Sequence, residues 1–150
     1  MSQYQAPLND ICFNLFHVWQ LDSWWQQQPQ LQELIEADTA KAILEEAAKI
    51  CEQQIAPFAA EADKRGAQLQ DGKVTLPAHY YTAYQSLAEG GWTGLSGDAD
   101  YGGMGMPKAI SAQVEEMVNS ANLSFGLYPM LTAGACLSIN AHASEELKEK

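Results

Sequence analysis

The segment Gly90-Gly91-Trp92-Thr93-Gly94-Leu95-Ser96-Gly97-Asp98-Ala99-Asp100-Tyr101-Gly102-Gly103-Met104-Gly105-Met106-Pro107 holds seven of the chain's 11 glycines. Glycine accepts positive φ angles and the close approach of another backbone, although it loses more conformational entropy on folding than other residues do. Helix-like patterns lead into the segment and out of it. We therefore predict a long connection of defined shape between two helices, with Trp92 and Leu95 as its apolar anchors.

Two interpretations of this segment differ in function. A phosphate-binding loop is disfavoured, because Gly103-x-Gly105 is shorter than a dinucleotide fingerprint and no Val- or Ile-rich strand precedes it. No Gly-Lys-Ser or Gly-Lys-Thr follows, so a P-loop is excluded. The residues favour the other interpretation, an ordered loop that packs Trp92 and Leu95 into a helical core.

Helical periodicity recurs on both sides of the segment. Apolar residues spaced three and four positions apart predict helices over residues 8–21, 38–56, 77–89, 107–118 and 122–143, and a further helix from Ser144. The predicted fold is all-α, an orthogonal or up-down helical bundle of about five to six helices with a long Gly-rich connecting loop.

Polar residues, prolines and glycines mark the expected boundaries. Asp38-Thr39 is suited to cap the second helix, and Glu45 and Lys49 are spaced to form an ion pair on its exposed side. Pro57 is expected to end or kink that helix, and Asp71-Gly72 predicts a turn between two short extended runs. Pro129 predicts a kink or a fresh start in the segment 122–143.

The charge of the chain excludes some classes of partner. The formal net charge is −11, with 8 Lys and Arg residues in total and Arg65 as the one arginine. Nucleic-acid binding requires a basic face, and docking on an anionic membrane requires basic clusters. We therefore expect neither nucleic acid nor membrane as a partner.

The cysteines and the chain ends bear on localisation. Cys12, Cys51 and Cys136 are odd in number and far apart, which disfavours a disulfide framework and a metal site. The N-terminus lacks the basic and apolar regions of a secretory signal. We expect reduced thiols, no bound metal and a cytoplasmic protein.

One segment is long enough to cross a membrane. Residues 123–143 contain no Asp, Glu, Lys or Arg, a length that could span a bilayer. However, the segment carries Pro129, Asn140 and His142 together with several small polar residues, so it is not predominantly apolar. The composition favours a buried helix inside a helical domain.

Few side chains suggest catalysis. Glu61 and Asp63 lie in a polar stretch without an apolar pocket to raise a carboxyl pKa, and they are interpreted as solvated charges. Glu115 and Glu116 lack a partner acid, metal ligand or nucleophile at a useful spacing. His79, in the first turn of a helix, is interpreted as a surface or capping residue. We predict no catalytic residue in this chain.

The adjacent residues Trp24 and Trp25 cannot both face one stripe of a helix. One of them is expected to pack against another part of the molecule or against a partner. The alternative is that both cover the domain's own flank.

Several separated motifs resemble the acyl-CoA dehydrogenase family. The loop pattern Gly91-Trp92-x-Gly94-Leu95 and Asp100-Tyr101-Gly102-Gly103-x-Gly105-x-Pro107 is similar to that family's inter-helix segment, with Asp100 where Glu is usual. Ala56-Pro57-x-Ala59-Ala60-Glu61-x-Asp63-Lys64-x-Gly66 is similar to an earlier block. Leu131-x-x-Gly134-Ala135 and His142-Ala143-Ser144-Glu145-Glu146-x-Lys148 resemble a later one, with Ala143 for Gly and Leu147 for Gln. Tyr4-Gln5-Ala6-Pro7-x-x-Asp10, followed by Phe13-x-Leu15, resembles the N-terminal extension of one subgroup.

This resemblance implies a domain organisation. Residues 1–36 correspond to the N-terminal extension, comprising a helix and a Trp/Gln-rich segment. Residues 37–150 correspond to the N-terminal helical domain, truncated at its C-terminal end.

The resemblance also implies a function. Family members are FAD-dependent oxidoreductases of fatty acid β-oxidation: a glutamate removes the α-proton of an acyl-CoA, and hydride passes from Cβ to the flavin. Electrons then pass to an electron-transferring flavoprotein, and the enzymes are usually dimers or tetramers. The flavin-binding and base-bearing segments have no match here, so this chain is expected to be inactive alone. Its expected part is one wall of the acyl pocket, built from Leu127, Tyr128, Met130, Leu131 and Gly134.

Two other functions remain open. The chain could be a free-standing, non-catalytic helical interaction module that docks through Trp24-Trp25 and the apolar flank around Leu127. It could also be a stress-response relative of the flavoproteins. The sequence itself does not reveal the length or identity of an acyl group.

Overall fold

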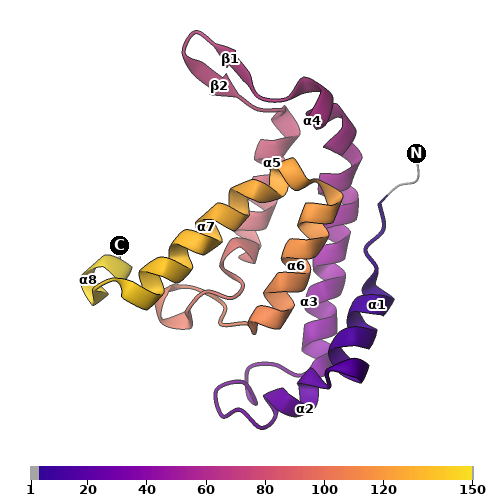
Figure 1. Cartoon of the computed structure of the whole chain (residues 1–150), viewed down its shortest axis with the longest axis vertical. Helices are drawn as coiled ribbons and strands as arrows, with labels where there is room; N and C mark the ends of the chain where they lie inside the picture. The colour runs from indigo at the N-terminus through magenta and orange to yellow at the C-terminus, as the bar shows by residue number, and fades with distance from the viewer. Residues whose placement is uncertain (1–3, 150) are drawn as a thin grey trace.

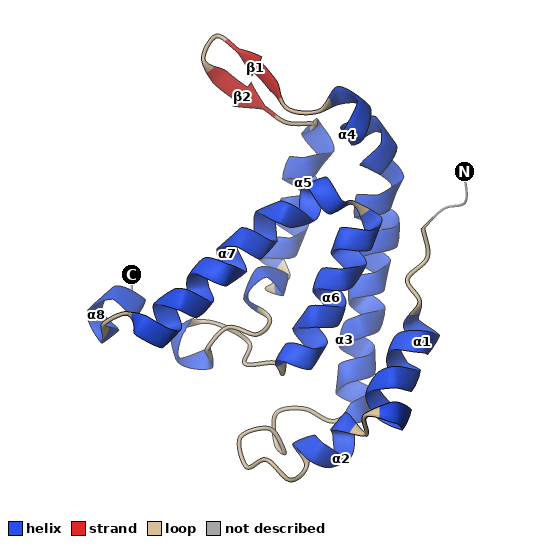
Figure 2. Ribbon diagram, in the orientation of Figure 1, coloured by secondary structure: helices blue, strands red, loops and turns tan. Residues whose placement is uncertain are grey.

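The computed structural model describes residues 4–149 and shows a helical protein (Figures 1 and 2). The long helices α3 (Ala37–Ile50), α5 (Ala78–Glu89), α6 (Lys108–Ala121) and α7 (Leu123–His142) surround the core. In the described chain the only strands are β1 (Gln68–Gln70) and β2 (Lys73–Thr75), which form a hairpin. The predicted all-α fold is confirmed.

Helix α3 supplies one wall of the core. Its apolar positions repeat at helical spacing, and Ala40, Leu44, Ala47 and Ala48 are buried. The N-cap is Glu36 rather than Asp38, because the helix already begins at Ala37. The ion pair expected between Glu45 and Lys49 is not the one formed; Lys49 Nζ lies 2.5 Å from Glu46 Oε1, one position away.

The helical path that begins with α3 changes helix type twice before it ends. A π-helical turn, Cys51–Ile55, is followed by a 3-10 turn, Ala56–Phe58, which contains Pro57. Helix α4 (Ala59–Arg65) then ends at Gly66, whose φ of 60° suits glycine. The hairpin follows, and its turn residues Asp71 and Gly72 have φ values of 51° and 73°. The predicted stop and turn are both confirmed.

Prolines start the next helices, as expected. Pro77 precedes α5 and Pro107 precedes α6. The missing proline N–H costs nothing at a position that has no intrahelical acceptor. The predicted stripe of α6, which comprises Ile110, Val114, Met117 and Val118, is buried along its length.

The N-terminal region lies along α3. It comprises α1 (Leu8–Cys12), a π-helical stretch (Phe13–Val18) and α2 (Leu21–Trp25). Trp25 is 1% exposed and packs edge-on against Phe16, whereas Trp24 is 52% exposed. Replacing a buried aromatic side chain of this size by alanine costs about 3–5 kcal/mol. One tryptophan therefore anchors the region to the domain, and the other faces away from it.

The Gly-rich segment folds back on itself between α5 and α6. The amides of Met104, Gly105 and Met106 donate to the carbonyls of Gly94, Gly97 and Leu95 at 3.0, 2.9 and 2.9 Å. At Gly103, a Cβ atom would overlap the carbonyl group of Gly97. These bonds bring Leu95 into the core at 4% exposure, as the sequence predicted.

Helix α7 departs from two expectations. The fresh start at Pro129 is wrong, because the helix already starts at Leu123, where the Asn122 side chain accepts a 3.2 Å hydrogen bond from Phe125 N, and it continues past Pro129 to His142. The expected burial is also wrong for most of its length: Phe125 and Gly126 are its buried residues. The uncharged sides of the helix lie mainly at the surface. Among residues 4–149, no helix combines the length and apolarity that crossing a membrane requires.

Replacing Gly103 by alanine should destabilise the protein by about 1–3 kcal/mol, because the new methyl group overlaps the Gly97 backbone and cannot rotate away. The matched control is Gly134→Ala on α7. Its Cβ meets no atom within 4 Å, so it should leave stability unchanged or raise it by up to ~1 kcal/mol. Urea denaturation of both variants makes the comparison, and an equal effect would contradict the packing described for the loop.

Candidate functional site

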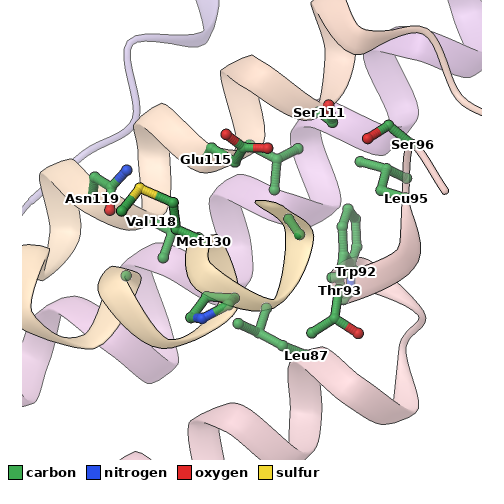
Figure 3. Close-up of a pocket in the computed structure, with 14 residues that line it drawn as sticks. Leu87, Trp92, Thr93, Leu95, Ser96, Ser111, Glu115, Val118, Asn119 and Met130 are labelled. Carbon is green, nitrogen blue, oxygen red and sulfur yellow. The ribbon is translucent and has the colours of Figure 1, made fainter. Parts of the chain in front are cut away.

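A small cavity of about 60 Å³ lies where α6, α7 and the Gly-rich segment meet (Figure 3). Most of its lining is apolar. The lining comprises Leu87, Trp92, Thr93, Leu95, Ser96, Ser111, Val114, Glu115, Val118, Asn119, Gly126, Pro129, Met130 and Ala133. Apolar walls with a few polar groups are typical of small-molecule sites.

The close packing of α6 on α7 shapes one end of the cavity. A Cβ atom at Gly126 would overlap Asn119 Oδ1, so a larger residue at this position would require the Asn119 side chain to move. Asn119 Oδ1 is buried and has no hydrogen-bond partner among the described residues. Figure 3 shows Asn119 and Met130 toward one end of the cavity and Leu95 and Ser96 toward the other. The cavity therefore holds an unused acceptor among apolar groups.

The charged group of the lining is neutralised. Glu115 Oε1 lies 2.8 Å from Lys108 Nζ, and both side chains are partly exposed. Ser111 Oγ donates to the Lys108 carbonyl oxygen at 3.2 Å. A paired carboxylate without a second titratable neighbour is not arranged as a general base.

The residues predicted for the acyl pocket fall on different sides of α7. Met130 lines the cavity, and Tyr128 lines a separate groove against α5. Leu127 and Leu131 are 45% and 71% exposed, and Gly134 has open space beside it. These last three residues share one side of the helix, which no other described element covers. We call this side, with Leu123, the free face of α7.

The other candidate side chains do not assemble a catalytic group. Glu61 and Asp63 are exposed. His79 is half-buried and stacks on Phe58 with ring centroids 4.6 Å apart, and its buried Nε2 has no hydrogen-bond partner among the described residues. Burial raises the pKa of Cys51 to about 12, which disfavours its thiolate. Within residues 4–149, no group of three or more His, Cys, Asp or Glu side chains is placed to hold a metal ion.

The Gly-rich segment is tied to the C-terminal helix α8 (Glu145–Lys148). Tyr101 OH donates a short hydrogen bond to Glu145 Oε2, and Lys148 Nζ lies 2.9 Å from Glu145 Oε1. The hydrogen bond to Glu145 raises the pKa of Tyr101 to about 12, and it lowers the pKa of Glu145. The contact closes one side of a second cavity of about 340 Å³ beside the C-terminal half of α7.

Sequence reasoning identified some of these residues and missed others. Trp92 and Leu95 were recognised as anchors from their place among glycines. Asn119 and Gly126 were not identified. A polar residue on an amphipathic helix and a glycine in a helix of small residues are both common, and neither pattern indicates that the two residues are in contact. Their contact follows from how α6 packs on α7.

Comparisons with known proteins relate the chain to one family. Residues 37–150 match the sequence model of the family described as "Acyl-CoA dehydrogenase, N-terminal domain". The chain is 44% identical over 147 residues to 3-methylmercaptopropionyl-CoA dehydrogenase of Ruegeria pomeroyi, covering 97% of this chain and 24% of that protein. It is 30% identical over 131 residues to the broad-specificity linear acyl-CoA dehydrogenase FadE5 of Mycobacterium tuberculosis, covering 85% and 21%.

A third relative is butyryl-CoA dehydrogenase of Syntrophomonas wolfei, which is 34% identical over 116 residues, covering 75% of this chain and 19% of that protein. The chain thus spans between 19% and 24% of the length of these relatives.

The contact between Tyr101 and Glu145 has a measurable titration. Two phenols, those of Tyr4 and Tyr101, have pKa values raised to about 12. Replacing Glu145 by glutamine removes the accepting carboxylate, so the Tyr101 pKa should fall toward about 10. Ultraviolet difference titration of the tyrosines should show one phenol shifting, while the Tyr4 pKa, raised chiefly by burial, stays.

The sign of the linkage follows from the raised pKa of Tyr101. Because the pKa of Tyr101 is higher in the folded state than in the unfolded state, the protonated phenol stabilises the fold at pH below about 10. This stabilisation is lost as the pH rises through about 12. Glu149→Gln is the matched control, because it removes a nearby carboxylate that makes no contact with Tyr101. A titration unchanged by Glu145→Gln would show that the hydrogen bond does not form in solution.

Proposed function

The chain belongs to the acyl-CoA dehydrogenase family, and we propose that it serves as the N-terminal helical domain of a flavin-dependent enzyme that dehydrogenates an acyl-CoA thioester between Cα and Cβ. In this proposal, residues 37–150 form the helical domain and residues 1–36 form an extension packed on it. The domain is a scaffold and one wall of the acyl pocket, and it is inactive alone.

One observation supports the location of the acyl chain. The cavity between α6, α7 and the Gly-rich segment is apolar and partly closed, as a site for a hydrocarbon tail should be. Burying such a tail contributes about 0.8 kcal/mol per CH₂ group. We propose that Met130 borders the tail inside this cavity. Leu127, Leu131 and Gly134 extend the proposed wall along the free face of α7, and Tyr128 extends it on the side that faces α5.

The free face of α7 fits the same proposal. Leu123, Leu127 and Leu131 expose apolar side chains in a row on a helix without charged residues. Patches of this kind mark a binding site or a surface covered by another part of a protein. In a complete enzyme, further polypeptide would cover this row and close the acyl pocket against Gly134.

The described residues do not fit a flavin. A flavin diphosphate requires positive charge or a free helix N-terminus, and the lysines nearest the cavities, Lys108 and Lys148, are paired with Glu115 and Glu145. No described residue of the lining is placed as the base that removes a proton. We therefore propose that FAD and the catalytic base are held by segments outside these 150 residues, and we assign no step of the reaction to this chain.

The proposal also covers the substrate, the pathway and the partners of the enzyme. The relatives are named for acyl-CoA substrates, which supports an acyl-CoA as the substrate here. We propose fatty acid β-oxidation in the cytoplasm, an electron-transferring flavoprotein as the electron acceptor, and a homo-oligomer, either a dimer or a tetramer.

A second candidate function rests on the N-terminal region. Trp24 and Trp19 are 52% and 71% exposed, a surface suited to docking a protein partner. Trp25 is buried and cannot take part in such docking. An interaction module would use this surface without acyl-CoA, so binding of acyl-CoA by the full-length protein discriminates between the two functions.

In the full-length enzyme, Gly134→Phe should shorten the longest acyl chain that is oxidised. Nothing lies within 4 Å of a Cβ at this position, so the ring would project into the space proposed for the substrate. The measurement is kcat/KM across acyl-CoAs of increasing length. Ala135→Phe adds a ring of comparable size one position along, away from the described cavities, and should leave the preference unchanged. The same chain-length profile in wild type and Gly134→Phe would remove Gly134 from the wall.

Met130→Ala tests the cavity by enlarging it, whereas Gly134→Phe fills space. Removing the flexible thioether enlarges the space beside Asn119, so longer acyl chains should gain in kcat/KM relative to short ones, by about tenfold for one or two added methylene groups. Met104, on the Gly-rich segment and outside this lining, supplies the control Met104→Ala. Equal loss for all chain lengths would indicate a structural role for Met130.

A further inference from the structure

An aromatic groove lies on another side of α7, and of its lining only Tyr128 also belongs to the proposed acyl wall. It lies between α5 and α7 and has a volume of about 510 Å³, within the range of small-molecule sites. Its aromatic walls are Tyr80, Tyr81 and Tyr84 from α5 and Phe125 and Tyr128 from α7. Helical spacing brings these rings to one side of each helix. We call this feature the tyrosine groove.

Tyr80 gives the tyrosine groove a fixed floor. It is 7% exposed, and its hydroxyl lies 2.7 Å from Ser124 Oγ and 3.3 Å from Asn122 Oδ1. Its ring meets Phe125 and Tyr128 edge to face, with centroids 5.3 and 6.2 Å apart. The Tyr80 ring is therefore held at steep angles to the Phe125 and Tyr128 rings by packing and hydrogen bonds before any ligand arrives.

The outer rings remain available. Tyr81, Tyr84 and Tyr128 are 58%, 37% and 42% exposed. Their hydroxyls form no hydrogen bond within residues 4–149. Partly exposed tyrosines whose hydroxyls are not hydrogen-bonded present both a ring face and a polar hydroxyl to a bound molecule.

The charges around the tyrosine groove favour a cationic ligand. Its lining includes no Lys or Arg. Gln85, which belongs to the lining, donates to Glu89 Oε1 at 2.7 Å and so holds a carboxylate beside the groove. The whole chain carries a formal charge of −11. Ring faces are themselves electron-rich, so a weakly hydrated cation is attracted and an anion is repelled.

We propose that the tyrosine groove binds a methylated organic cation of the quaternary ammonium class. The cationic head lies among the rings of Tyr81, Tyr84 and Tyr128, above the floor formed by Tyr80 and Phe125. A quaternary head has no N–H donor, so it needs only ring faces and a negative surrounding field. The groove is separate from the cavity that borders Met130, and the inference does not depend on the proposed dehydrogenase activity.

The experiment uses the full-length protein and two probes of nearly equal shape. Choline carries the quaternary nitrogen, whereas dimethylbutanol replaces that nitrogen by carbon and is neutral. Saturation-transfer NMR with titration measures the affinity of each probe. Choline should bind at least about fivefold more tightly than dimethylbutanol, because the neutral probe gains burial but no attraction to the ring faces.

Matched variants locate the binding. Tyr84→Leu and Tyr128→Leu should each weaken choline about two- to tenfold and leave dimethylbutanol nearly unchanged. Both side chains are partly exposed, so the fold should tolerate the changes. Trp19→Leu removes another exposed aromatic ring, one that belongs to the N-terminal region and not to the lining of the groove, without changing the net charge.

The outcomes separate clearly. Equal affinity for the two probes, or no binding of either, overturns the proposal. Weakening of choline by Trp19→Leu as strong as that caused by Tyr84→Leu would show general attraction to an acidic surface and would also overturn it. A gap between the probes that disappears only when a ring of the groove is removed supports it.

Discussion

The contact between Gly97 and Gly103 constrains much of this structure. The backbone at Gly103 passes so close to the backbone at Gly97 that a Cβ atom does not fit between them. Nearby backbone amides donate hydrogen bonds to carbonyls across the loop at 2.9–3.0 Å. The hydrogen bonds compensate for the entropy that a glycine-rich chain loses when it is ordered. The doubled loop then holds Trp92 and Leu95 at a defined place between α5 and α6, where α7 crosses.

Helix α7 carries a different environment on each side. Gly126, Pro129 and Met130 face the cavity, whereas Phe125 and Tyr128 face α5. The third side, the free face, meets solvent. The two sides that face the cavity and α5 have apolar neighbours, and the free face exposes Leu123, Leu127 and Leu131.

The N-terminal region shows how a short segment is held without a core of its own. Its helices are too short to be stable in isolation. Trp25 inserts among residues of the domain, and Ala6 N donates to Glu52 Oε1 at 2.9 Å at the other end. Tyr4 packs nearby, where burial and the charges of Cys51, Glu52 and Glu116 raise its pKa. Between these two attachments Ile11 and Leu15 are also buried in the core, whereas Trp19 and Trp24 remain exposed.

Sequence alone determined the approximate positions of the long helices α3, α5, α6 and α7, the hairpin turn, the buried stripe of α6 and the anchoring role of Leu95. Each depends on local properties: spacing along one helix, the fixed φ of proline and the freedom of glycine. The family resemblance was also readable, because its motifs are contiguous in the chain. Only the tertiary structure decided that Trp25 and not Trp24 is buried, that Gly126 meets Asn119, and that the predicted pocket residues of α7 divide among three sides. Periodicity places a residue around its own helix axis, but which neighbour it meets depends on how several helices pack together, and that is a property of the whole fold.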